Sequence, residues 1–186
     1  DLAAMRRLAE QGGRLTMPGG EYYIIWGVIV GLGFLSTYLI GTRIVPLPFW
    51  AISVGWAILI VIGWTLSIWR GRSTSRNPDS VRMTNRIVAS VWITTGFAMG
   101  VFFFANLAFG RFGGEAMGIV SPFFVGAAFS VIALLCRLNG MLVAAAGWFV
   151  LGVAAMFLTF TLTTIPLFAG AFVLLMVGTG LKLIAM

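Results

Sequence analysis

The sequence predicts an all-α, polytopic membrane protein with six transmembrane helices. Of its 186 residues, 60% are hydrophobic and 9% are charged, whereas soluble domains carry about a quarter charged residues. The mean hydropathy is +1.05. Six apolar runs follow one another along the chain, each close to the roughly twenty residues that a helix needs to cross the hydrocarbon core. We expect residues 1–20 to form a cytoplasmic tail or an interfacial helix and residues 21–186 to form one transmembrane domain.

The polar N-terminal segment precedes the first span. Leu2, Met5 and Leu8 fall roughly on one helical face, which suits a short helix lying in the membrane interface. A solvated tail explains the same residues equally well. Pro18-Gly19-Gly20 ends any such helix before the membrane begins.

The six spans are delimited by aromatic residues and turn signals. Amphipathic aromatic residues such as Trp26, Trp50 and Trp69 prefer the headgroup level, so they mark where apolar runs begin or end. Asn77-Pro78 and Asn139-Gly140 are turn signals that return the chain to the membrane. On this basis the expected spans are 22–40, 48–69, 87–109, 119–136, 141–161 and 165–184.

Basic residues predict the orientation of the bundle. With six spans, ten basic residues fall on the side that holds both termini, and two, Arg43 and Arg111, fall on the other side. Cytoplasmic loops carry the excess of Arg and Lys, so we expect both termini inside, in a bacterial cytoplasmic (inner) membrane. Basic loops also favour anionic lipids as partners. The loop after the second span is the strongest orienting element, and its arginines are Arg70, Arg72, Arg76, Arg82 and Arg86.

Two short patterns suggest that the chain contains three tandem repeats of one helical hairpin. A Pro opens every second span, and Pro suits a first helical turn because its missing N–H is not needed there. Such repeats are related by an axis along the membrane normal. Chance agreement is the alternative, because both features are common in membrane helices. The matching residues are Pro48, Pro122 and Pro166 at the even spans, and Trp26, Trp92 and Trp148 near the start of the odd spans.

The residue types argue against catalysis and cofactor binding. The chain has no His and one Cys, Cys136, so it cannot by itself form a His-ligated haem, a clustered metal site or an intramolecular disulfide. None of its five acidic residues lies inside an expected span, although acid–base and nucleophilic catalysis need a titratable group in the site. We therefore expect no enzyme, no metal and no cofactor. Nucleic acid is not expected as a partner either, because the net charge of +7 sits in short loops beside the spans.

Glycine spacing marks two candidate helix-packing faces. Gly27 and Gly31 form a GxxxG pair in the first span, and Gly96 and Gly100 form another in the third. Small residues at this spacing let two helix backbones approach closely in lipid. Such a face serves inside one bundle or between two chains, and the sequence leaves both uses open.

Asn106 is the residue in the spans that is most costly to leave unpaired in hydrocarbon. Because the third span runs outward and the fourth returns, Asn106 and Phe103 are expected to share a level with Phe123 and Phe124. These four residues form a candidate site for a small ligand, with Asn106 as the polar contact and the rings as apolar walls. An interhelical hydrogen bond from Asn106 is the alternative.

Two functional classes fit these observations. In the first, the chain is a non-enzymatic membrane protein that binds, senses or passes a small neutral or apolar molecule within its bundle. In the second, it is an accessory or structural subunit that docks through its Gly-rich faces, with another membrane protein or a second copy as partner. Purification discriminates between them, because a self-sufficient bundle purifies alone and a subunit co-purifies with its partner.

Overall fold

The computed structural model describes residues 19–74, 79–110, 115–158 and 161–185. These ranges contain six helices and no strand, and each helix is long and apolar enough to cross a membrane. The predicted all-α fold with six spans is therefore confirmed. The expected N-terminal tail or interfacial helix, Arg76 and Arg111 lie outside the described residues. The helices are α2 (Gly20–Gly41), α3 (Trp50–Thr74), α4 (Asp79–Phe109), α5 (Ala116–Cys136), α6 (Asn139–Phe157) and α7 (Ile165–Ile184).

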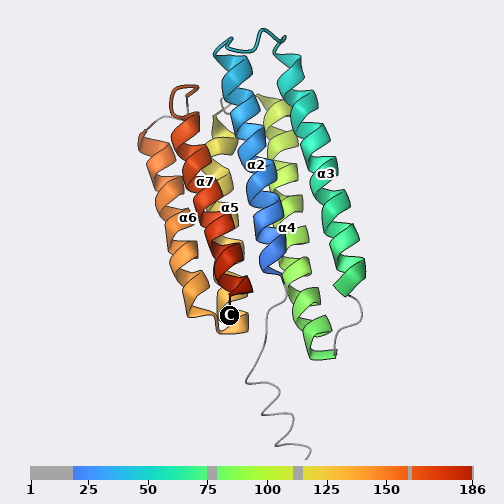
Figure 1. Ribbon diagram of the computed structural model, residues 1–186. Coiled ribbons are helices and arrows are strands. Elements are labelled where there is room, and N and C mark those ends of the chain that lie inside the picture. The colour runs from blue at the N-terminus through green and yellow to red at the C-terminus, as the bar shows by residue number, and fades with distance from the viewer. Residues whose placement is uncertain (1–18, 75–78, 111–114, 159–160, 186) are drawn as a thin grey trace, which may run out of the picture.

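The helices stand side by side and alternate in direction, so the connections gather at two ends (Figure 1). Packing contacts join them in the spatial order α3, α2, α7, α6, α5, α4. Helices α2 and α5, the second and fifth in this order, meet across the bundle through Tyr23 and Phe129, whose ring centroids are 5.2 Å apart. We call the end with the α5–α6 turn and the C-terminus the basic end, because it holds Arg70, Arg72, Arg86, Arg137 and Lys182.

The α2–α7 contact brings two backbones together at the basic end. A Cβ placed on Gly20 would lie 2.4 Å from the carbonyl oxygen of Gly180, and a Cβ on Gly180 would lie 2.5 Å from the carbonyl oxygen of Gly20. Real Cβ atoms do not approach other atoms so closely, so this crossing requires glycine on both helices. Close backbone approach at small residues is the usual packing mode in lipid, where no hydrophobic force draws helices together.

Helices α2 and α3 pack through tryptophans that fill glycine notches in each other. The Trp56 indole of α3 lies 2.6 Å from the position that a Cβ of Gly33 would take. Its Nε1 donates a hydrogen bond to Thr37 Oγ1 at 3.0 Å. In return, Trp26 of α2 lies 3.1 Å from the corresponding position at Gly63. These two notches set the spacing and the register of the pair.

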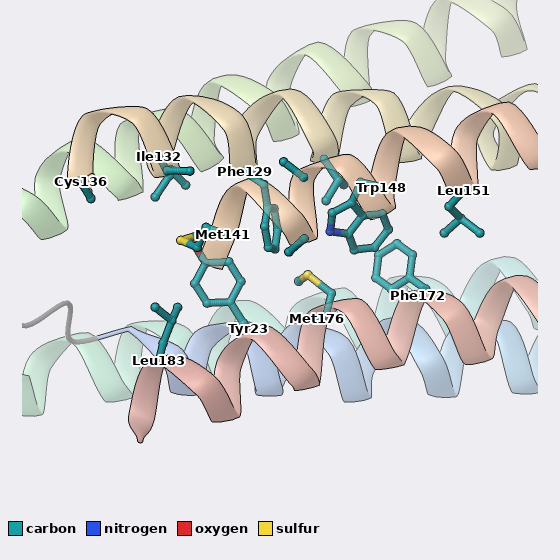
Figure 2. Close-up of a cluster of buried hydrophobic side chains, with 14 of the residues drawn as sticks. Tyr23, Phe129, Ile132, Cys136, Met141, Trp148, Leu151, Phe172, Met176 and Leu183 are labelled. Atoms are coloured by element: carbon teal, nitrogen blue, oxygen red, sulfur yellow. The ribbon is translucent and has the colours of Figure 1, made fainter. Parts of the chain in front are cut away.

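The hydrophobic core lies between α2, α5, α6 and α7 (Figure 2). Trp148 is completely buried, and its ring meets the Phe172 ring edge-on with the centroids 4.6 Å apart. The expectation that Trp148 stands near the start of its span is wrong, because it occupies the middle of α6. The largest fully buried side chains of the core are Trp148, Phe129, Ile132 and Met141.

The expected threefold hairpin does not describe the packing. Pro166 occupies the first turn of α7 and Pro48 stands just before α3. Pro122, however, lies inside α5, which begins at Ala116, so the expectation that this Pro opens its span is wrong. The most extensive contacts, α2 with α7 and α5 with α6, also join helices from different hairpins.

Candidate functional site

Two of the candidate ligand residues, Phe103 and Asn106, lie on α4, and the other two, Phe123 and Phe124, lie on α5. Phe123 belongs to the α5–α6 interface: its ring lies 2.8 Å from the position that a Cβ of Gly152 would take, and its centroid is 6.3 Å from that of Phe149. Phe103 is exposed on α4 and makes an edge-on contact with Phe104.

Asn106 and Phe124 are partly buried. A ligand role for Asn106 stays a prediction.

The two GxxxG pairs have different surroundings. Gly27 lies against Met176, with 2.9 Å between the Met Cβ and the position of an added Cβ, and Gly31 lies against Val173 at 2.5 Å. Both contacts are with α7, so this pair forms a helix-packing face inside the bundle. At Gly96 and Gly100, by contrast, an added Cβ would meet no described atom within 4 Å. The second pair therefore does not pack against another described helix.

Helix α4 has two distinct faces. On one face, Val88, Val91 and Trp92 pack against the buried core. No residue in the apolar window of α4 is itself buried, whereas 44% of the window of α5 is buried. The exposed surface that adjoins this face is apolar, and its residues recur at helical spacing. We call it the α4 outer face, and it comprises Ile93, Gly96, Phe97, Gly100, Val101 and Phe104.

Other glycines also meet open space, and they provide a comparison. Gly170 and Gly178 of α7 have no described atom within 4 Å of an added Cβ. They are separated by Leu174, whose exposed side chain stands between them on the same side of the helix. No notch of the GxxxG kind forms there. Among these open surfaces, the α4 outer face is the one with a glycine pair at the spacing that receives a second helix.

The expected membrane-orienting arginines include one with a structural partner. Arg70, near the end of α3, donates hydrogen bonds from Nε and a terminal nitrogen to the two carboxylate oxygens of Glu21 on α2. This bidentate pair adds an ionic contact to the α2–α3 interface, at partly exposed side chains. Arg72 and Arg86 are exposed at the same end. An orienting role for the loop stays a prediction.

The described residues contain no candidate metal centre, since no three His, Cys, Asp or Glu side chains come together there.

Comparison with known proteins finds no relative: no protein-family model, no curated protein and no solved structure matches the chain. A functional assignment therefore depends on the residues and surfaces of this chain. The α4 outer face is the candidate interaction site.

Proposed function

We propose that the protein is a non-enzymatic accessory subunit of a larger membrane complex and docks through the α4 outer face. Its bundle is an integral membrane helical bundle, which we place in a bacterial cytoplasmic membrane with both termini inside. One observation carries the proposal: the glycine pair of α4 faces open space, whereas the matching pair of α2 is filled by α7.

The cost of glycine in a helix supports this reading. Each Gly in a helix interior costs about 1 kcal/mol relative to Ala, and in lipid the compensation is close approach of another helix. Gly27 and Gly31 obtain that contact from Val173 and its neighbours on α7. Gly96 and Gly100 have no such contact within the described residues, and a helix from another protein would provide it.

The filled interior favours docking over passage of a molecule. The centre of the bundle is occupied by Trp148, Phe129 and Ile132, whose side chains are completely buried. One of the candidate ligand residues, Phe123, packs against Gly152 of α6. The occupant that we propose is a transmembrane helix of a different membrane protein, lying along Gly96 and Gly100 beside Phe97 and Phe104.

Site-specific photo-crosslinking in native membranes tests the proposal. Phe97 beside the glycine notch and Leu174 on α7 are each 73% exposed, so a photoreactive residue at either position samples its surroundings equally well. We expect a discrete protein adduct from position 97 and only lipid adducts from position 174. Adducts of the same kind at both positions, or none at position 97, would contradict docking on α4.

Substitution of the notch provides the second arm. Gly100→Leu should abolish the adduct from position 97 without lowering the melting temperature of the isolated protein, because the added side chain meets open space. Gly178→Leu is the matched control and should change neither. Gly31→Leu should lower the melting temperature, because α7 fills that notch. An adduct made of two copies of this chain would show a homo-oligomer and refute the subunit assignment.

A further inference from the structure

A pocket of about 230 Å³ opens at the basic end, between the α5–α6 turn and the last turns of α7. Its floor is formed by Met141, Thr179 and Leu183, which are buried. Arg137, Asn139 and Lys182 are exposed and form its polar mouth. Ligand pockets that enclose whole drug-sized molecules measure about 300–1,000 Å³, so this pocket suits a small group.

Positive charge is concentrated at the mouth of this pocket. Lys182 Nζ lies 2.8 Å from the position that a Cβ of Gly140 would take. Its ammonium group therefore sits over the first turn of α6, which is the positive end of that helix. Arg137 adds a second cation from the α5 C-cap, where its backbone is left-handed with φ 54°.

These cations have no counter-ion within the described part of the chain. Neither the Arg137 nor the Lys182 side chain forms an ion pair or hydrogen bond there. Glu21, at the same end, is bound by Arg70. Arg137 and Lys182 stand at the negative C-terminal ends of α5 and α7, and an anion between the two side chains and the α6 N-terminus would be attracted by all three.

The donors around the pocket match an oxyanion. Guanidinium, ammonium and the Asn139 side-chain amide all donate hydrogen bonds, and a first helical turn leaves backbone N–H groups without partners inside the helix. The α6 N-terminus has no side-chain cap. Thr179 Oγ1 already donates to the carbonyl oxygen of Leu175 at 2.7 Å, so Thr179 completes the wall without donating to a ligand.

We propose that this pocket binds a phosphate group, carried either by an anionic lipid headgroup or by a free phosphate ion. The pocket lies at the ends of three helices of membrane-crossing length, at Cys136, Asn139 and Ile184, and the headgroup region begins where the apolar part of a span ends. The apolar floor at Met141 and Leu183 offers a surface for the methylene groups next to a lipid phosphate. No residue of α4 lines the pocket, so the site is independent of the docking surface.

Binding measured on delipidated protein in neutral detergent tests this site. The probes are inorganic phosphate, added at constant ionic strength, and the short-chain lipid dihexanoyl phosphatidylglycerol, with dihexanoyl phosphatidylcholine as the zwitterionic control. Saturable binding of phosphatidylglycerol alone identifies a lipid headgroup site, and binding of both phosphate and phosphatidylglycerol identifies a phosphate site. Equal binding of chloride and phosphate, or no binding of either phosphate probe, would overturn the proposal.

Charge-neutral variants assign the binding to the pocket. Lys182→Gln and Arg137→Gln should each raise the Kd about tenfold, which corresponds to loss of one charge-assisted hydrogen bond. Arg86→Gln removes a charge at the same end outside the pocket and should change the Kd less than about twofold. Because all three side chains are exposed, the folded helix content should be unchanged. An equal loss in Arg86→Gln would show that net charge, not the pocket, attracts the phosphate, and unchanged binding in both pocket variants would refute the site.

Discussion

Addition of one methyl group at Gly180 should separate α2 from α7. In Gly180→Ala the new Cβ would lie 2.5 Å from the Gly20 carbonyl oxygen, 2.7 Å from Ile24 Cγ1 and 3.2 Å from the Ile24 nitrogen. Two of these atoms belong to the backbone and cannot rotate away. The helices must move apart along their whole contact, so the substitution loosens packing at Gly27 and Gly31 as well.

The size of the effect follows from two opposing terms. Overpacking of a tight contact typically costs about 1–3 kcal/mol, and the move from Gly to Ala in a helix returns up to about 1 kcal/mol. Gly178 is the matched control on the same helix, because an added Cβ there meets no described atom within 4 Å. Gly178→Ala should therefore be neutral or slightly stabilising, and Gly180→Ala should be less stable than Gly178→Ala by about 1–3 kcal/mol.

Equilibrium unfolding of both variants in detergent, followed by helical circular dichroism, measures this difference. Because both substitutions change Gly to Ala in α7, the propensity term cancels between them. A double variant, Gly20→Ala with Gly180→Ala, should cost less than the sum of the single variants, because one displacement of the helices relieves both contacts. Equal stability of Gly180→Ala and Gly178→Ala would refute the close backbone crossing of α2 and α7.

Three further predictions test the topology, a polar contact and the predicted ligand residue. Trp56→Phe and Thr37→Val should show a coupling energy of roughly 0.6 kcal/mol in a double-mutant cycle, the average for such hydrogen bonds in a membrane protein. Trp56→Phe alone should cost more, because it also removes the ring that fills the Gly33 notch, and full additivity would show that the hydrogen bond contributes no energy. Asn106→Leu should lower stability by a similar amount if the amide bonds another helix, whereas loss of ligand binding without a change in melting would identify a binding residue. Reporter fusions should be cytoplasmic when placed after Arg14, Arg76 or Arg137. Fusions placed after Arg43 or Glu115 should be external. A reversed result at any one of these positions would contradict the predicted orientation.

Several features of the fold were accessible from the sequence because they depend on local properties of the chain. Six apolar runs of membrane-crossing length specify six helices wherever the helices later pack. The GxxxG pair at Gly27 and Gly31 predicted a close helix contact, and α7 provides it. The same motif at Gly96 and Gly100 has no partner in the described chain. A GxxxG motif therefore predicts a helix surface suited to close packing, but it does not predict which helix packs there.

Other features were misjudged because short patterns do not report depth or burial. The pattern places Trp148 near the membrane surface, yet Trp148 is buried in the core, where its ring contacts Phe129 and Phe172. A Pro was taken as the start of a helix, yet α5 begins at Ala116 and runs through Pro122. The glycines at the tightest crossing, Gly20 and Gly180, are far apart in the chain and belong to no common motif.

The sequence by itself determined that the chain forms six apolar helices, because hydrophobicity and helical period are properties of consecutive residues. The tertiary structure decided which helices meet, because contact in lipid depends on how the notches and ridges of remote segments match. Gly33 receives Trp56, Gly180 receives Gly20, and Lys182 lies over Gly140. The phosphate pocket that we propose arises in the same way: Arg137 and Lys182 are separated by the whole of α6 and most of α7, and only packing of α7 against the α5–α6 turn brings their charges to one mouth.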